Sequence, residues 1–305
     1  PSMDGMASAT SSVDRDGLKI SLPTRAPSSV VADTDVLAAA PRELILAGYG
    51  DMAAKYVSLA EWELSHEITG EFYCPEIARV VREALLRAEA SVEAALAGDA
   101  AAAGVLTEGL LLAGLAMECA GLSRPASGME HYVSHIRSMR ALSFGTRSDL
   151  HGLECGAAAL GVIRVYERLR EVRQPDRARA LAHAASFDYA AHAAFLRTFV
   201  GAGAETMIAL EAREGKYDAA RHGARLEAIL ARWERVREIL WALPPSEALA
   251  ARYARIAFPT LEALGVGAEE AAGLYLAAPD IRDKYVQGRL LWDLGEVRLA
   301  EAFGA

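Results

Sequence analysis

Two histidines lie four residues apart in the segment SRPASGMEHYVSHIRSM, which covers residues 123–139. Positions i and i+4 lie on one face of a helix, so this spacing places His131 and His135 on the same side. Neutral imidazole is a good ligand for zinc and similar transition metals. The spacing alone leaves three interpretations open, which are a metal site, a substrate contact, and two packed or exposed histidines.

Two further segments carry residues suited to the same chemistry. In LAGYGDMAAKYVSLAEWELS (46–65), Gly48 and Gly50 permit a tight turn, and we expect Asp51 at the following helix N-terminus. In SDLHGLECGAAALGV (148–162), His151 is expected at a helix start. One carboxylate and two or three histidines near helix starts could converge on one divalent ion and leave an open, catalytic coordination position. A simple helix cap would also explain Asp51.

The neighbours of these residues allow structural and functional interpretations. Lys55 lies one turn after Asp51, where it could neutralise that carboxylate, meet an anionic substrate group, or remain solvated. Glu130 follows the expected helix start at the position of a capping carboxylate. Gly152 and Gly156 permit either close helix packing or close approach of a ligand. The other histidines, at 66, 183, 192 and 222, have no such context and are interpreted as structural or exposed.

Composition narrows the class of protein. The 305 residues are 52% hydrophobic and rich in alanine, which favours a large helical core. The net charge of −9 argues against a nucleic-acid partner. Cys74, Cys119 and Cys155 form no CxxC motif, which makes a disulfide framework improbable and favours a reducing compartment. The apolar run 109–117 is too short to span a bilayer, and residues 1–12 lack signal-peptide features, so we expect a cytoplasmic protein without membrane insertion.

Helical periodicity and stop signals predict a mainly α fold from residue 37 onward. Helices are expected over 75–97, 101–119, 147–173, 176–200, 204–241 with a break near Gly215 or Gly223, 246–264 and 268–277, with a last one opening at Pro279. Residues 17–23 and 30–32 instead show strand patterns. Two short strands are not stable alone, so residues 1–36 are predicted to be the edge of an α/β domain whose other strands lie outside this chain, and 37–305 a helical domain.

The quoted segments together resemble the sn-glycerol-1-phosphate dehydrogenase family. This family belongs to the superfamily of glycerol dehydrogenase, iron-type alcohol dehydrogenases and dehydroquinate synthase. The resemblance rests on AGYGD…K…SLAEW, SRPASGMEHYVSH, LHG, APDIRDKY…LLWDLG and the opening PSMDGMAS, in matching order and spacing. It runs from Ser2 to about Gly295 and implies a multi-helical metal- and substrate-binding domain, with a short β remnant of a nucleotide-binding domain.

The resemblance also implies roles for individual residues. Asp51, His131 and His151 match the family's metal ligands, and Asp51 also lies beside the substrate. His135 matches a catalytic histidine that contacts the substrate and could relay a proton, and Asp4 matches a substrate-binding aspartate.

The cofactors follow from the same resemblance. Ser2 and Ser8 match residues that line the nicotinamide cofactor. The family's usual metal is zinc, or nickel in some bacterial relatives, and its hydride carrier is NAD(P). The glycine-rich dinucleotide loop of the family has no counterpart here, so this chain alone is expected to bind metal but to show little NAD-dependent turnover.

The implied function is the metal-dependent, NAD(P)-linked interconversion of sn-glycerol 1-phosphate and dihydroxyacetone phosphate. We expect the partners of the chain to be this small phosphorylated substrate and further copies of the same chain in a homo-oligomer. The substrate phosphate needs cationic partners, and the candidates are Lys55, Arg137, Arg282 and Lys284. Two alternatives remain open at this point. One is another superfamily member, such as a glycerol or alcohol dehydrogenase or a dehydroquinate synthase-like cyclase, and the other is a truncated, catalytically silent helical domain.

Overall fold

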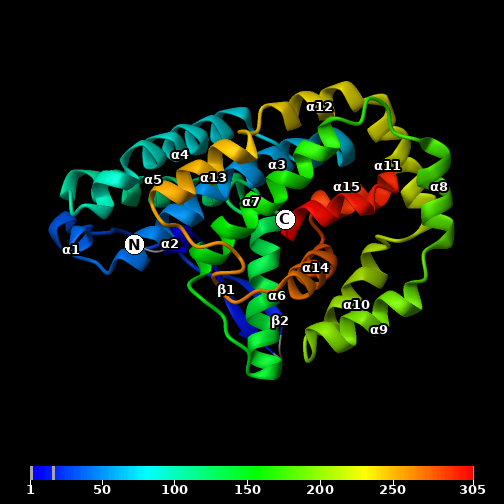
Figure 1. The fold of residues 1–305 in the computed structure, drawn as a ribbon, viewed down its shortest axis with the longest axis horizontal. Helices are drawn as coiled ribbons and strands as arrows, with labels where there is room; N and C mark the ends of the chain where they lie inside the picture. Colours follow the sequence, from blue (N-terminus) through cyan, green and yellow to red (C-terminus); the bar gives the residue numbers. More distant parts are fainter. Residues whose placement is uncertain (1–2, 16–17, 305) are drawn as a thin grey trace.

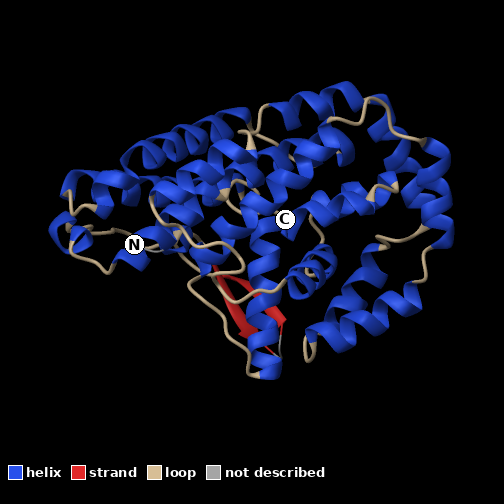
Figure 2. Ribbon diagram, in the orientation of Figure 1, coloured by secondary structure: helices blue, strands red, loops and turns tan. Residues whose placement is uncertain are grey.

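The computed structural model describes residues 3–15 and 18–304, and over these ranges the chain is mainly helical, as predicted (Figures 1 and 2). The strands within the described ranges are β1 (Thr10–Arg15) and β2 (Leu18–Pro23), which form an antiparallel hairpin. In its register Thr10 lies opposite Pro23 and Arg15 opposite Leu18. The hairpin lies beside α6, with which β2 is in contact.

The strand predicted over residues 17–23 is confirmed where the structure describes it, but the strand predicted over 30–32 is wrong. These residues belong to an irregular segment that leads into a short helix, α1 (Thr34–Ala38), and the Val31 side chain is 93% exposed. A run of three small apolar residues is stable as a strand only when a neighbouring strand and a buried face support it. The division of the chain at residue 36 stays a prediction.

The helices before residue 175 build the part of the fold that positions the chemistry. They are α2 (Arg42–Ala53), α3 (Lys55–Thr69), α4 (Pro75–Leu96), α5 (Ala100–Ala120), α6 (Met129–Phe144) and α7 (His151–Arg170). The predicted helices over 75–97 and 101–119 are confirmed almost to the residue. Their ends follow the expected signals, because Pro75 opens α4, Gly98 adopts a φ of 90°, and Asp99 caps α5 by accepting a hydrogen bond from the Ala102 N–H.

The helices after residue 175 are shorter than the sequence predicted. They are α8 (Arg177–Ser186), α9 (Tyr189–Val200), α10 (Ala204–Glu214), α11 (Ala219–Ala231), α12 (Trp233–Trp241), α13 (Ser246–Arg255), α14 (Ala268–Ala277) and α15 (Gln287–Leu294). The predicted break in 204–241 occurs at Gly215, with a φ of 60°, and a second one at Arg232. Asp188 opens α9 as an N-cap, which divides the predicted 176–200 helix.

Two other predicted helices differ in the C-terminal third. The helix predicted over 246–264 ends at Arg255, since Ala257 has a φ of 48° and Pro259 disfavours helical backbone at the residue before it. Pro279 opens only a single 3₁₀ turn, η2 (Ala278–Asp280), and the last α-helix begins at Gln287. The chain ends in a further 3₁₀ segment, η3 (Val297–Gly304).

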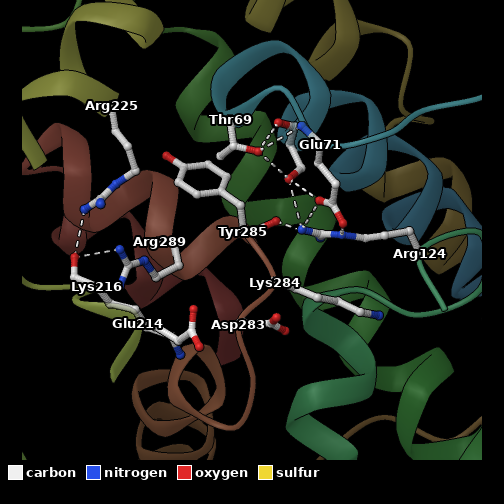
Figure 3. A pocket seen from close by; sticks show the side chains of 11 residues that line it. Thr69, Glu71, Arg124, Glu214, Lys216, Arg225, Asp283, Lys284, Tyr285 and Arg289 are labelled. Carbon is white, nitrogen blue, oxygen red and sulfur yellow. Dashed lines mark hydrogen bonds and ion pairs between the residues drawn. The ribbon is translucent and has the colours of Figure 1, made fainter. Parts of the chain in front are cut away.

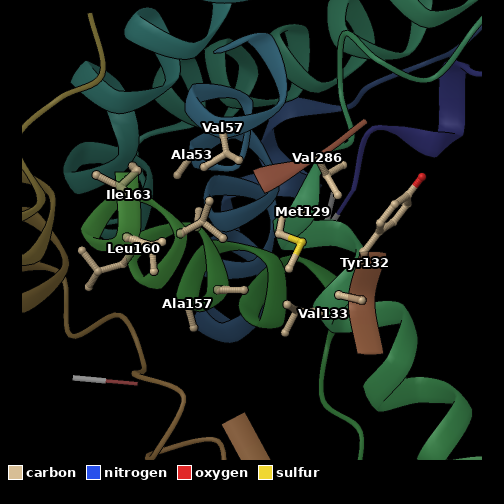
Figure 4. Packing of buried hydrophobic residues seen from close by; sticks show 14 of the residues in the cluster. Ala53, Val57, Met129, Tyr132, Val133, Ala157, Leu160, Ile163 and Val286 are labelled. Atoms are coloured by element: carbon tan, nitrogen blue, oxygen red, sulfur yellow. The ribbon is translucent and has the colours of Figure 1, made fainter. Parts of the chain in front are cut away.

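The core is built where α2, α3, α6 and α7 pack together. Figure 4 shows side chains from these helices meeting in one cluster, among them Ala53, Val57, Val133 and Leu160. Helices α2 and α7 are in extensive contact, and α4 pairs with α5 on the outer side of α2. The cluster therefore fixes the relative positions of the helices that carry the candidate metal ligands.

Helix α5 is long enough and apolar enough to cross a membrane by length and composition alone. This differs from the prediction, which considered only the run 109–117. Half of its most apolar window is buried inside the fold, where it packs against α4 and the 3₁₀ segment η1 (Asp4–Ala7). One such helix is weak support for a membrane span, because the core helix of a globular fold has the same properties.

The contact between α2 and α7 depends on a glycine. A Cβ atom built on Gly50 would lie 2.1 Å from the Gly152 carbonyl oxygen. Backbone cannot move away as a flexible side chain can, so we expect Gly50→Ala to destabilise the fold by about 3 kcal/mol, near the upper end for overpacking. Urea unfolding monitored by circular dichroism measures this loss.

Gly223→Ala is the matched control for this prediction. Gly223 lies inside α11, and a Cβ there meets no atom within 4 Å. Its replacement should stabilise the helix by roughly 0.5–1 kcal/mol, because alanine loses less backbone entropy than glycine. Equal stabilities for the two variants would contradict the proposed backbone contact.

Candidate metal centre

Asp51 lies in the last turn of α2, not at a helix N-terminus as the sequence predicted. Gly48 and Gly50 are helical residues and form no turn, because the glycine at position 50 serves the close packing against α7. Helix α3 follows after Ala54, which itself has helical φ and ψ angles of −56° and −24°. Asp51 and Lys55 therefore keep their i, i+4 relation across the junction, and their side chains form an ion pair with Nζ 2.9 Å from Oδ1.

The Asp51 carboxylate is held by residues from three parts of the chain. Its Oδ2 accepts a 2.7 Å hydrogen bond from the Asp4 backbone N–H. The Lys55 ammonium lies 2.6 Å from the Asp4 carboxylate and donates to the Ala126 carbonyl oxygen at 3.1 Å. Although burial opposes it, Lys55 and His131 hold the pKa of Asp51 well below its ordinary value. The structure thus brings the sequence-predicted Asp4 directly to Asp51.

His131, the second proposed metal ligand, lies in the first turn of α6. Its Nε2 lies 3.4 Å from Asp51 Oδ1, and its Nδ1 lies 2.7 Å from Glu130 Oε1. The same Glu130 oxygen accepts a hydrogen bond from the Gly128 N–H at 2.8 Å, which is the capping role that the sequence predicted. Glu130 therefore orients the His131 ring so that Nε2 faces Asp51.

His151 is the first residue of α7, as predicted, and completes the set. Its Nδ1 lies 3.0 Å from the Ser134 hydroxyl, which in turn donates to Glu154 Oε2 at 2.7 Å. The ring centroids of His131 and His151 are 5.0 Å apart. Burial, together with the charge of His131, lowers the pKa of His151 to about 3, so its imidazole is neutral at physiological pH.

Cys155 is a donor that the sequence reasoning missed. One donor atom each from His131, His151 and Cys155 lie within 4.8 Å of one another, and Cys155 Sγ is 3.5 Å from His151 Nε2. Burial raises the pKa of this thiol to about 11. The signal was present, because Cys155 follows His151 by one helical turn. Two imidazoles, a carboxylate and a thiol suit a zinc-class ion chemically, so the residues present fit a metal of that class.

His135 lies beside this cluster, not within it. Its ring stacks on His151 with centroids 5.7 Å apart and an interplanar angle of 20°. It is buried, and its Nδ1 has no hydrogen-bond partner among the described residues. Burial and the neighbouring cations lower its pKa well below the ordinary value, so the ring is neutral. The structure therefore distinguishes two histidines that the sequence pattern presents as equivalent.

The remaining sequence-predicted residues have different positions. Ser8 is buried directly after η1, the segment that brings Asp4 to the site, whereas Ser2 lies outside the described residues. Of the histidines interpreted as structural, His192 lies 2.6 Å from an Asp280 carboxylate oxygen and His222 lies 2.9 Å from the Asp293 carbonyl oxygen. Both are buried.

Of the four candidate phosphate-binding cations, Lys55 and Arg137 are held in buried ion pairs, whereas Arg282 donates to the Lys19 carbonyl oxygen at 3.2 Å and Lys284 to the Ser127 carbonyl oxygen at 2.8 Å. Lys55 is fully buried between Asp4 and Asp51, as described above. Arg137 is buried in ion pairs with Glu154 and Asp149, at 2.8 and 3.0 Å. These two side chains help to hold the site together, because their ion pairs connect the helices and loops that carry the proposed metal ligands.

Glu61, on α3, binds the backbone at the first residue of α6. Its Oε2 accepts a hydrogen bond from the Met129 N–H at 2.8 Å, and its Oε1 accepts from the Gln287 N–H and the Tyr166 hydroxyl at 2.8 and 3.0 Å. Burial raises the pKa of Glu61 to about 7, the Glu130 carboxylate adds to the rise, and the two backbone donors oppose it.

This raised pKa predicts a pH dependence of stability. A carboxyl with a higher pKa in the folded state binds its proton more tightly there. Its contribution to the free energy of unfolding is therefore complete below the pKa of the unfolded state and is lost as the pH rises towards 7. For Glu61 we expect a loss of about 3 kcal/mol between pH 4.5 and 7.5, from 1.36 kcal/mol per pKa unit. Urea unfolding across this range should show the slope in the natural sequence and not in Glu61→Gln. Parallel profiles would contradict it.

Comparison with known proteins finds similarity to two groups of dehydrogenases. Residues 1–41 match the profile of the iron-containing alcohol dehydrogenases. A glycerol-1-phosphate dehydrogenase, NAD(P)+-type, from Halalkalibacterium halodurans is 39% identical over 167 residues, which are 55% of this chain and 42% of the relative. The enzyme of the same name from Bacillus subtilis is 40% identical over 171 residues, which are 56% of this chain and 43% of the relative.

A third relative shows a similar identity and coverage. The glycerol-1-phosphate dehydrogenase of Hyperthermus butylicus is 40% identical over 166 residues, or 53% of this chain and 45% of the relative. The matched part of the chain thus spans less than half the length of each of these curated relatives. The predicted resemblance is confirmed, since more than half of this chain is similar to the NAD(P)-linked glycerol-1-phosphate dehydrogenases and its first 41 residues to the iron-containing alcohol dehydrogenases.

Proposed function

We propose that this chain provides the metal- and substrate-binding part of an NAD(P)-linked oxidoreductase that interconverts sn-glycerol 1-phosphate and dihydroxyacetone phosphate. The observation that carries the proposal is the buried convergence of Asp51, His131 and His151 from α2, α6 and α7. The names of the relatives supply the substrate and the nicotinamide cofactor. We also propose a cytoplasmic homo-oligomer, on the grounds given from the sequence.

Asp51, His131 and His151 would hold the metal, for which we propose zinc or nickel, with the Cys155 thiol beside it. When bound, the metal supplies Lewis-acid polarisation of the substrate's alcohol or carbonyl oxygen. The surrounding side chains fix these ligands. Glu130 orients His131, and Ser134 orients His151. Such partners determine which ring nitrogen is free to bind a metal.

Lys55 and Asp4 fix the Asp51 carboxylate in the same way. The Lys55 ammonium keeps Asp51 ionised in a fully buried position, and the Asp4 N–H fixes its second oxygen. An ionised carboxylate is the form that binds a metal, so this pair prepares the site before any ligand enters. Asp4, which η1 places beside Asp51, is proposed to contact the substrate next to that carboxylate.

His135 is proposed to contact the substrate and to hold or release a proton at its Nδ1. This atom is buried and unpartnered among the described residues, and the centroid of its ring lies 6.4 Å from that of His131 and 5.7 Å from that of His151. A neutral imidazole can accept a proton from a substrate hydroxyl or return one to a carbonyl oxygen. Ser8 is proposed to line the nicotinamide, since it follows directly on the segment that carries Asp4.

The test is turnover by the full chain after reconstitution with zinc or nickel. NADH and NADPH formation from sn-glycerol 1-phosphate, and their consumption with dihydroxyacetone phosphate, are followed by absorbance, with sn-glycerol 3-phosphate and glycerol as controls. Metal-dependent binding of dihydroxyacetone phosphate, measured by calorimetry in parallel, is expected. NAD(P)-linked turnover should be stereospecific and metal-dependent but weak in this chain alone, as the sequence predicts. A chain that binds metal but neither binds nor turns over the phosphorylated substrate would contradict the proposal.

A further inference from the structure

A pocket with a volume of about 330 Å³ lies between α9, α14, α15 and η3. The loops that precede α9 and α11 complete its lining. In the part of the chain that the structure describes, none of the proposed metal ligands and none of the four candidate phosphate-binding cations lines it. The pocket is therefore separate from the residues that the proposed function uses.

Aromatic rings form one wall of the pocket. Phe187 stacks on Tyr217 with centroids 4.5 Å apart and an interplanar angle of 25°. The Trp292 ring meets Tyr217 edge-on at 5.0 Å and Phe187 edge-on at 5.4 Å. Leu276 and Leu291 are among the aliphatic residues of the lining. A pocket of this size with a mainly apolar and aromatic lining is typical of a site for a small organic molecule.

Two buried donors in this lining have no acceptor among the described residues. They are Nη1 of Arg289, which is 4% exposed, and Nε1 of Trp292, which is 6% exposed. The Arg289 Cζ lies 5.9 Å from the Trp292 ring centroid and 5.3 Å from that of Tyr217, so the two donors lie close together. A buried N–H without an acceptor carries the full cost of its desolvation, so an acceptor that enters the pocket is favoured.

The second terminal nitrogen of Arg289 fixes the position of the guanidinium. Nη2 donates to the Lys216 carbonyl oxygen at 2.7 Å, and the same oxygen accepts from Arg225 at 2.8 Å, as Figure 3 shows. Arg289 also lines the neighbouring charged pocket drawn in that figure, together with the carboxylates of Glu214 and Asp283. The unused Nη1 donor, and not a surplus of positive charge, is therefore the feature that a ligand recognises.

The mouth of the pocket is open to solvent. Leu276 is 50% exposed and Val297 is 40% exposed. Arg298 and Glu301 also line the pocket and are exposed, with charges of opposite sign. The polar groups at the mouth thus have no net charge, whereas the unsatisfied donors lie deeper, beside the aromatic rings.

We propose that this pocket binds a planar aromatic carboxylate. A carboxylate has two acceptor oxygens for the two unsatisfied donors, and its geometry suits a guanidinium. The ring of the ligand packs against Phe187, Tyr217 and Trp292, where aromatic pairs gain more than the burial of their area alone. The volume suits a molecule of one or two fused rings.

The proposal is tested by isothermal titration of the full chain with 2-naphthoate at constant ionic strength, and we expect one binding site per chain. Two analogues test the two halves of the ligand. Decahydro-2-naphthoate lacks the planar rings, and 2-naphthamide lacks the charge and one acceptor oxygen. Each should bind at least about threefold more weakly than 2-naphthoate. Equal affinity of either analogue, or no binding of 2-naphthoate, would overturn the proposal.

Trp292→Phe keeps a ring in the wall and removes the Nε1 donor. It should lower the affinity for 2-naphthoate at least about tenfold, the effect of one hydrogen bond to a charged group. Trp241→Phe is the matched control, because Trp241 is 50% exposed at the end of α12 and does not line the pocket. Equal affinities in these two variants would overturn the assignment of the donor.

Leu276→Trp tests the site without altering its buried wall. Leu276 is half exposed at the mouth, so a larger side chain there should obstruct the pocket and leave the fold intact. We expect at least about a tenfold loss of affinity, from the lost hydrogen bonds of the carboxylate. Circular dichroism establishes that each variant is folded, and Leu276→Trp carries the test if Trp292→Phe does not fold. Unchanged affinity in Leu276→Trp would place the ligand elsewhere and overturn the proposal.

His131→Ala separates this pocket from the metal centre. Carboxylates also bind metal ions, so 2-naphthoate should bind equally well to this variant, which lacks a proposed metal ligand that does not line the pocket. Loss of binding in His131→Ala would place the ligand at the metal centre and contradict the proposal. Failure of 2-naphthoate to bind leaves the proposed dehydrogenase function untouched, because that function is measured with a different substrate.

Discussion

Replacing His131 with alanine should abolish stoichiometric metal binding, whereas replacing His135 should leave it intact and reduce turnover. His131 Nε2 lies 3.4 Å from Asp51 Oδ1 and shares the donor cluster with His151, while His135 lies outside that cluster. Removing only a hydrogen-bond partner of a metal ligand typically weakens binding by roughly 10–100-fold, so we expect the loss of a ligand to exceed about 100-fold. Zinc and nickel titrations followed by elemental analysis measure it.

His66→Ala is the matched control, because His66 is an exposed histidine at the end of α3. Its metal content and affinity should equal those of the natural sequence. The interpretation that separates the two histidines fails if His135→Ala loses metal to the same extent as His131→Ala. Retention of full metal content in His131→Ala would instead remove the proposed centre itself.

Replacing Lys55 with methionine should be the most destabilising single change at the site. The ammonium is fully buried and lies 2.6 and 2.9 Å from carboxylate oxygens of Asp4 and Asp51. Methionine fills a similar volume but leaves two buried carboxyl groups without their cation. Removing one partner of a buried ion pair costs about 3–5 kcal/mol, and we expect a loss of this size in the metal-free protein, measured by urea unfolding at pH 7.

Two variants serve as controls for this prediction. Lys55→Arg keeps the positive charge and should be less destabilising than Lys55→Met. Arg79→Met removes an exposed cation from the ion pairs with Glu76 and Glu83 on α4, and should change stability little, because solvent screens such pairs. Similar unfolding midpoints for Lys55→Met and Arg79→Met would show that the buried pair does not contribute as the geometry indicates.

The sequence by itself determined the helical character of the chain and several of its helix ends. Pro75, Gly98 and Asp99 act locally, by restricting φ or satisfying the free N–H groups of a first turn, so α4 and α5 could be predicted closely. The same holds for Glu130 at the start of α6 and His151 at the start of α7. Local chemistry sufficed wherever the cause lay within a few residues.

Tertiary packing decided the features that local signals misjudged. The sequence predicts a turn at Gly50, yet this residue lies inside α2. A glycine is needed there because the Gly152 carbonyl of α7 occupies the space that a side chain would fill. The predicted strand at 30–32 has no neighbouring strand and remains exposed in the structure. A sequence window contains no information about a contact partner a hundred residues away.

The same reason separates what could be predicted about the site from what could not. The resemblance to a family identified Asp51, His131 and His151, but spacing alone could not bring three helices to one point. Only the fold shows that Asp4 and Lys55 hold Asp51 and that Cys155 Sγ lies beside His151. The pair of histidines at i and i+4 looks symmetric in sequence. The positions of Asp51 on α2 and of His151 and Cys155 on α7 bring His131 into the donor cluster and leave His135 outside it.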